Sequence, residues 1–189
     1  MIDLAAALRA VVSALEAVER EYVVVGSTAA AAWGSARTAR DVDLVVMVGS
    51  HADELVDRLS DPDLYVPADL ARSALEGTGS FNVLHLTSGG KVDVFVADPA
   101  DAFTRSRLSR RVRADVFGVP AWVATPEDVV LAKLRSRLDT RSEVQWRDCV
   151  EIAATNELDV DYLESWAGRL GVEADLSDLL SGVDGGAAD

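Results

Sequence analysis

The stretch that decides the fold is residues 23–48, VVVGSTAAAAWGSARTARDVDLVVMV. An apolar run ends at a Gly-Ser pair, an alanine-rich segment follows, and an arginine-containing loop leads to a second apolar run. Short apolar runs bounded by glycine and polar residues are typical of buried strands. The pattern therefore predicts a strand over residues 22–25, a tight turn, a helix over residues 27–33 and a second buried strand.

The second apolar run carries two carboxylates, Asp41 and Asp43. Residues i and i+2 of a strand point to the same face, about 6.6 Å apart, so these two side chains should lie together. Close carboxylates repel each other and lose solvation, and a bound cation removes both penalties. Because cysteine and histidine are absent from this stretch, oxygen-preferring Mg²⁺ or Mn²⁺ is the expected metal. Two solvated residues at a sheet edge would give the same short pattern.

The turn between the first strand and the helix contains Gly26 and Ser27. The start of a helix offers free backbone N–H groups and the positive end of the helix dipole, and here a hydroxyl is added. These groups suit a phosphate. A phosphate site joined to a metal site by one short loop predicts a nucleoside triphosphate carried as its metal complex.

Gly26-Ser27, thirteen further residues and then Asp-Val-Asp-Leu resemble the signature of the DNA-polymerase-β-like nucleotidyltransferase superfamily. In that superfamily a third carboxylate lies on a neighbouring strand between apolar residues, and Asp93 in KVDVFV matches it. The resemblance covers about residues 20–150. It implies an α/β (α+β) fold with a small mixed twisted sheet, flanking helices and a helical C-terminal part.

The resemblance also implies roles for the matching residues. Asp41, Asp43 and Asp93 would be the catalytic and metal-binding carboxylates, and Asp93 could also take a proton from the acceptor hydroxyl. Gly26 and Ser27 would hold the β and γ phosphates. The reaction would transfer a nucleoside monophosphate from a nucleoside triphosphate, with ATP as one candidate, and would release pyrophosphate.

Three basic residues are further candidates for nucleotide binding. Arg37 and Arg40 precede the two aspartates, where they either stay solvated or contact Asp41 or the triphosphate. The segment TPEDVVLAKL begins as a helix with a threonine cap, a proline and two acids. It resembles the helical tail of abortive-infection toxin-like nucleotidyltransferases, which implies that Lys133 faces the phosphates.

The formal net charge of the 189-residue chain is −14. So acidic a chain gains little from counterion release along a polynucleotide, although a short RNA end remains open. The five arginines within residues 105–113 form its basic cluster. They suit either a solvated helix end beside acids or a rim that binds the phosphates of RNA or pyrophosphate.

The acceptor therefore stays open among three classes of function. A toxin-type enzyme would modify a tRNA end or a protein and could have a cognate antitoxin partner. A small-molecule enzyme would adenylylate an antibiotic, and an acidic chain suits a cationic substrate of that kind. A non-catalytic antitoxin or binding protein would keep the fold without turnover, but the presence of all three carboxylates argues against it.

The domain organisation follows from the same patterns. We expect a catalytic core over residues 1–124, a C-terminal helical part packed on it over residues 125–181, and a disordered tail over residues 182–189. The single cysteine, Cys149, fits a reducing compartment. No apolar run approaches the roughly 20 residues of a membrane-spanning helix, so we expect a cytoplasmic protein without a membrane partner.

Overall fold

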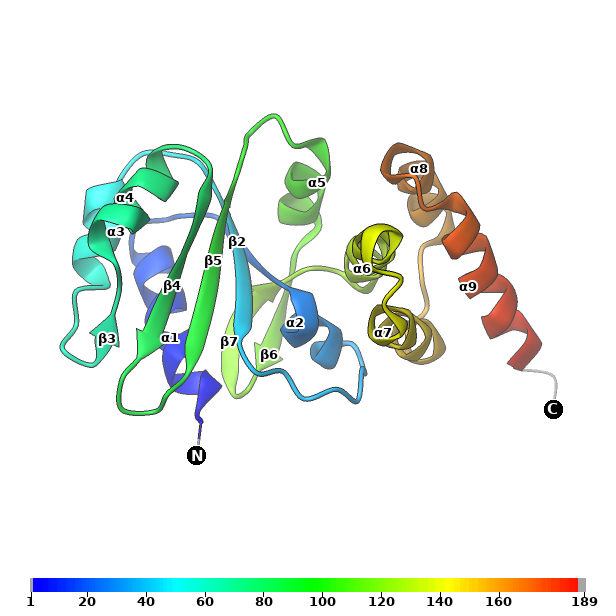
Figure 1. The fold of residues 1–189 in the computed structure, drawn as a ribbon, viewed down its shortest axis with the longest axis horizontal. Helices are drawn as coiled ribbons and strands as arrows, with labels where there is room; N and C mark the ends of the chain where they lie inside the picture. The colour runs from blue at the N-terminus through cyan, green and yellow to red at the C-terminus, as the bar shows by residue number, and fades with distance from the viewer. Residues whose placement is uncertain (1, 187–189) are drawn as a thin grey trace. The chain divides into compact units, whose positions relative to one another are not determined.

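The computed structural model describes residues 2–186 of the chain. The chain forms two compact units. The first contains Met1–Thr28 and Ala39–Ala124, and the second contains Ala29–Thr38 and Thr125–Asp189. The first unit holds a mixed sheet and its helices, and the second is helical, so the predicted mixed α/β fold class is confirmed (Figure 1).

A seven-stranded sheet is the centre of the first unit, with strand order β3-β4-β5-β2-β1-β7-β6. Its strands are β1 (Tyr22–Val25), β2 (Val42–Met47), β3 (Leu64–Tyr65), β4 (Gly79–His85), β5 (Lys91–Ala97), β6 (Val112–Val116) and β7 (Val119–Val123). Two neighbouring pairs are parallel, β2 with β5 and β1 with β7, and the other pairs are antiparallel. The parallel pair β2–β5 brings together two segments that are far apart in the sequence.

The helices of the first unit pack on the sheet and on one another. They are α1 (Leu4–Ala17), α3 (Ala52–Arg58), α4 (Ala68–Glu76) and α5 (Ala102–Arg110), and α2 (Gly26–Ala32) begins in this unit. Helix α1 is capped by Asp3 and packs against β4, β5 and β7, α4 packs against β4, and α3 packs on α4 and α1. The apolar stripe of α1, with Leu8, Val11 and Leu15, is buried as its spacing predicts.

Alternate residues of β2 and β5 form the core layer of the sheet. Val42, Leu44 and Val46 on β2 are fully buried. In the β2–β5 register, Val92 pairs with Val42 and Val94 pairs with Leu44. The intervening positions point to the opposite face because strand side chains alternate. That alternation directs the aspartates of both strands to one face.

The second unit contains α6 (Pro126–Thr140), α7 (Glu143–Thr155), α8 (Val160–Leu170) and α9 (Glu173–Gly186). Helix α6 packs on α7 and α8, and α9 packs on both α7 and α8. Thr125 caps α6 by accepting a hydrogen bond from the Asp128 backbone N–H, as the sequence predicts. Helix α9 includes residues 182–186 of the predicted tail, and residues 187–189 lie outside the described residues.

Candidate active site

The centre of the candidate site is a pair of aspartates on neighbouring strands. Asp43 on β2 lies directly opposite Asp93 on β5 in the parallel register. On the other side of β2, Asp43 pairs with Val25, the last residue of β1. The register thus joins the predicted third carboxylate to the second, and it places both beside the turn that follows β1.

Gly26 occupies that turn in the left-handed region, with φ of +67°. A Cβ atom built on Gly26 would overlap Oδ2 of Asp43. Both the backbone conformation and the close approach of a carboxylate therefore favour glycine at this position. Ser27 follows as the second residue of α2. Because Val25 pairs with Asp43, the predicted phosphate-binding residues Gly26 and Ser27 come directly after the strand residue beside Asp43.

Asp41 precedes β2 rather than lying within it, because the strand begins at Val42. The sequence pattern extended the strand by one residue too many at this end. The loop is instead fixed by Thr28, whose Oγ1 donates a 2.9 Å hydrogen bond to the Asp41 carbonyl oxygen. The Asp41 side chain is about one-third exposed, and Arg40 just before it is exposed.

Lys91, which the sequence analysis did not identify, lies between two of the three carboxylates. Its Nζ lies 2.6 Å from Oδ2 of Asp93 and 3.3 Å from Oδ2 of Asp41. The hydrogen bond to Asp93, together with the nearby Asp41, raises the pKa of the Lys91 ammonium above its ordinary value. The i, i+2 spacing of Lys91 and Asp93 on one strand face was the available signal.

One oxygen of this cluster has no partner in the structure. Oδ1 of Asp93 is buried and accepts no hydrogen bond, whereas Oδ2 is bound by Lys91. Within residues 2–186, no group of three His, Cys, Asp or Glu side chains converges as a metal site in this arrangement. Asp43 lies against Gly26, and Asp41 and Asp93 turn to the ammonium of Lys91.

The donor set nevertheless fits a divalent cation. All three side chains offer only oxygen, which Mg²⁺ and Mn²⁺ prefer, and a buried carboxylate oxygen without a partner is costly to maintain. The Lys91 ammonium already lies between Asp41 and Asp93, so this position accommodates a positive charge. Asp41, Asp43 and Asp93 are the residues that would hold the metal.

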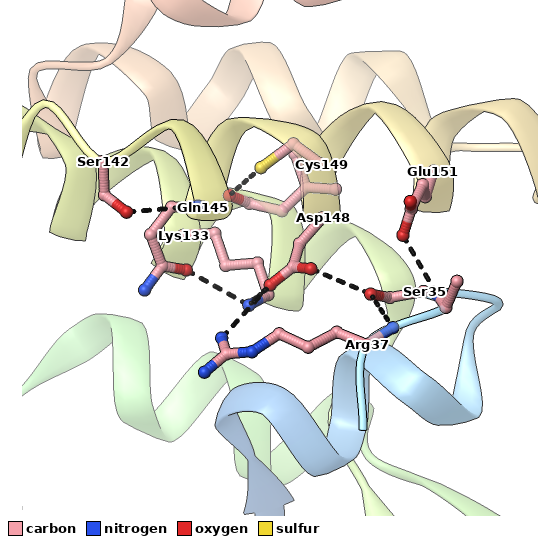
Figure 2. Close-up of polar contacts among 10 residues, drawn as sticks. Ser35, Arg37, Lys133, Ser142, Gln145, Asp148, Cys149 and Glu151 are labelled. Carbon is pink, nitrogen blue, oxygen red and sulfur yellow. Dashed lines mark hydrogen bonds and ion pairs between the residues drawn. The ribbon is translucent and has the colours of Figure 1, made fainter. Parts of the chain in front are cut away.

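The predicted lysine of the helical part, Lys133, lies in the second unit and is buried (Figure 2). Its Nζ donates to Oδ2 of Asp148 at 2.6 Å and to Oε1 of Gln145 at 3.1 Å. The other oxygen of Asp148 accepts a 2.8 Å hydrogen bond from Ser35 Oγ. The structure therefore shows Lys133 as part of a closed internal network that connects α6, α7 and the segment after α2.

Arg37 belongs to the same network but is half-exposed. Its Nη1 lies 3.9 Å from Oδ2 of Asp148, and its backbone N–H donates to Ser35 Oγ (Figure 2). Next to it, the Ala36 backbone N–H donates to Oε2 of Glu151 at 2.9 Å. Helix α7 thus fixes the segment that carries Arg37, although the sequence gives no sign of this pairing.

The arginine cluster of residues 105–113 is largely engaged within the first unit. Arg111 donates to Glu21 at 3.0 Å and lies over the Trp122 ring, and Arg113 donates to Glu16 at 2.6 Å. Arg105 and Arg111 also donate to backbone carbonyl oxygens. The contacts match the first of the two sequence-based interpretations, in which the arginines balance nearby acids.

No helix in the described part of the chain is long and apolar enough to cross a membrane. No protein-family model matches the chain, and no curated protein matches it. Solved structures do match over nearly all of its length. One is an antigenic nucleotidyltransferase-like protein from Paracoccidioides brasiliensis, 21% identical, with a TM-score of 0.54, covering 94% of this chain and 93% of that one.

Two structures of the antibiotic-resistance factor ANT(2″)-Ia are also similar. The solution structure is 13% identical with a TM-score of 0.57, covering 96% of this chain and 95% of that one. The crystal structure with adenylyl-2″-tobramycin is 14% identical with a TM-score of 0.52, covering 86% and 94%. At these identities the likeness concerns the fold. The chain shares the nucleotidyltransferase fold of these structures.

Proposed function

We propose that the protein is a divalent-metal-dependent nucleotidyltransferase that transfers a nucleoside monophosphate from a nucleoside triphosphate to an acceptor hydroxyl. The observation that carries the proposal is the pairing of Asp43 with Asp93 on adjacent parallel strands, with Gly26 in contact with Asp43. A structural ion cluster needs neither a left-handed glycine against a carboxylate nor a buried oxygen without a partner.

The proposed chemistry assigns a task to each group. A bound divalent cation would neutralise charge on the triphosphate and polarise the reacting phosphoryl group. Gly26 and Ser27, at the start of α2, would hold phosphate oxygens through backbone N–H groups and the hydroxyl. Asp93 would accept the proton of the attacking hydroxyl. Arg37 and Arg40 would contact the nucleotide.

The structure changes the role that we assign to Lys133. Its side chain is 6% exposed and its ammonium is bound by Asp148 and Gln145, so contact with pyrophosphate would require Lys133 to leave that network. We therefore assign Lys133 a positioning role, in which it holds α7 and, through Asp148, the segment that carries Ser35 and Arg37. The resemblance alone implied direct phosphate contact.

The central test is nucleotide binding with and without metal. Calorimetry with each nucleoside triphosphate should show binding in Mg²⁺ or Mn²⁺ and none in EDTA, because the crowded carboxylates repel a free triphosphate. Asp93→Asn should reduce transfer by more than about tenfold while sparing most of the nucleotide affinity. Asp53→Asn, an exposed carboxylate paired with Arg72 in the same unit, is the matched control. Equal binding in EDTA would contradict the metal-carboxylate proposal.

A small-molecule acceptor is favoured over RNA by one observation. The arginines that could form a phosphate-binding rim are engaged with Glu16, Glu21, Trp122 and backbone carbonyl oxygens. Charges that are already paired within the protein contribute little to counterion release on RNA binding. The net charge of −14 acts in the same direction.

The toxin-type alternative, with a cognate antitoxin as partner, makes an opposite prediction where its acceptor is a tRNA end; a protein acceptor gives the same result as a small molecule. Under that alternative, changing Arg110 and Arg111 together to Gln should flatten the log–log salt dependence of binding by about one to two units. Under the small-molecule proposal, the double variant labels its acceptor as well as the wild type at every salt concentration. Labelling assays with tRNA and with aminoglycosides therefore separate the two.

A further inference from the structure

A lysine ammonium lies among the carboxylates to which the proposed function assigns a metal. Nζ of Lys91 is 2.6 Å from Asp93 Oδ2 and 3.3 Å from Asp41 Oδ2. Lys91 is the first residue of β5, two positions before Asp93, so both side chains point to the same face of the sheet. Its position is therefore set by the strand register and does not depend on a flexible loop.

The lysine balances this cluster only in part. One ammonium faces two carboxylates directly, and Asp43 lies opposite Asp93 as a third. The buried Oδ1 of Asp93 stays without a partner while Lys91 bonds to Oδ2. A cation of charge two with several oxygen ligands would satisfy more of these oxygens than a lysine can.

The lysine can also leave the cluster at low cost. Its side chain is 35% exposed and lies at the first residue of the strand. A displaced ammonium regains water, so leaving the carboxylates does not expose an unsolvated charge. Ion pairs of this partly exposed kind contribute little net stability.

We propose that Lys91 is a displaceable internal counter-ion, which competes with the divalent cation for Asp41 and Asp93. This inference rests on the proposed function. It adds that the protein binds free metal weakly until Lys91 moves away. A triphosphate offers the displaced ammonium a new anionic partner, so metal and nucleotide are expected to bind together more tightly than either binds alone.

The test is a titration with Mn²⁺ alone, in which binding is measured by calorimetry or by the electron paramagnetic resonance signal of free Mn²⁺. Lys91→Met should bind Mn²⁺ about tenfold more tightly than the wild type, because a contacting positive charge has been removed. Lys91→Arg keeps a cation and should stay close to the wild type. Arg72→Gln removes an equal charge, one surrounded by Asp53, Asp57 and Asp69, and is the matched control.

A second readout tests the coupling to nucleotide. A non-hydrolysable triphosphate should strengthen Mn²⁺ binding more in the wild type than in Lys91→Met, whose metal site is already accessible. Urea denaturation confirms that each variant is folded, and Lys91→Gln repeats the test with a shorter neutral side chain. Mn²⁺ affinities of Lys91→Met and Lys91→Gln no higher than that of Arg72→Gln would overturn the proposal.

The same titrations separate this inference from the proposed function. If wild type and Asp93→Asn bind Mn²⁺ equally without nucleotide, Asp93 is not a metal ligand and the metal site of the proposed function fails. If Asp93→Asn loses Mn²⁺ binding but Lys91→Met gains none, the function stands and only the role of Lys91 is wrong.

Discussion

Each unit of the protein contains a lysine–aspartate pair with the same separation. The two pairs differ in their exposure to solvent and in the partners of the second carboxylate oxygen. Nζ lies 2.6 Å from Oδ2 in both Lys91–Asp93 and Lys133–Asp148. The side chains of the first pair are 35% and 15% exposed, and those of the second are 6% and 3% exposed. The second oxygen of Asp148 accepts from Ser35, whereas that of Asp93 has no partner.

The comparison teaches that the length of an ion pair says little about its role. A buried pair whose remaining groups are all bonded holds elements together, and removing one member leaves a charge without compensation. A partly exposed pair with an unsatisfied oxygen contributes little to stability and remains able to bind something else. By this criterion Lys133–Asp148 is structural and Lys91–Asp93 belongs to the candidate active site.

The largest expected effect is on folding and should separate the two lysines. Lys133→Met should lower the free energy of unfolding by about 3–5 kcal/mol, because Asp148 is left buried without its ammonium. Lys91→Met should change it by less than about 1 kcal/mol. Urea denaturation measures both. A double variant, Lys133→Met with Asp148→Leu, should recover much of the loss, and equal effects of the two single changes would refute the comparison.

The aspartates should differ in the same direction by a smaller amount. Asp148→Asn keeps the shape and the Ser35 contact but removes the anion that faces Lys133, which should cost about 2–3 kcal/mol of unfolding free energy. Asp93→Asn removes the partly exposed ion pair with Lys91 but also relieves repulsion from Asp41 and Asp43, so stability should stay within about 1 kcal/mol of the wild type. Only Asp93→Asn should weaken the binding of free Mn²⁺.

A comparison of two glycines tests whether Gly26 has a specific role beside Asp43. Gly26→Ala should cost about 2 kcal/mol, since alanine at a positive φ is strained and its Cβ would displace the Asp43 carboxylate. Gly118 has a similar φ, +76°, with no atom within 4 Å of an added Cβ. Gly118→Ala should therefore show the backbone strain alone, about 1 kcal/mol, with normal nucleotide binding. Loss of nucleotide binding in both variants would contradict a specific role for Gly26.

The smallest effect concerns Cys149, which lies on α7 next to Asp148. Burial raises the pKa of its thiol from 9.0 to about 12. The folded state therefore keeps the proton that the unfolded state loses, so this contribution is complete below pH 9 and falls as pH rises towards 12. From about pH 8 to about pH 9.5 the wild type should lose about 1 kcal/mol more unfolding free energy than Cys149→Ala. Parallel pH profiles of the two proteins would disprove it.

Local sequence signals predicted the elements that carry the carboxylates. The strand over residues 22–25 agrees with β1, and the Thr125 cap of α6 is present as expected. Asp43 and Asp93 both lie in strands with buried apolar neighbours, as predicted. The prediction succeeds because the alternation of side chains along a strand is a local property of the sequence. The position of Asp41 just outside β2 was missed, since strand ends depend on pairing with neighbours as well as on composition.

Partners that lie far apart in the sequence could not be predicted from it. Ser35 bonds to Asp148, 113 residues away, and no local pattern announces such a contact. Lys91 was visible beside Asp93, but its contact with Asp41 depends on the β2–β5 register. The direct phosphate role of Lys133 came from the resemblance, and the structure shows the competing internal partners that the resemblance could not contain.

The segment 29–38 has a practical consequence for preparing fragments of this protein. It is encoded between β1 and β2, yet it belongs to the second unit, where Thr155 and Asn156 donate to the Trp33 carbonyl oxygen. A gene fragment that stops at residue 124 would therefore carry a segment whose partners have been deleted. The reverse fragment would lack Trp33 and Ser35, which bond to Thr155 and Asp148 of α7. Excision after residue 124 should give poorly expressed, aggregation-prone material, whereas the intact chain retains both sets of partners.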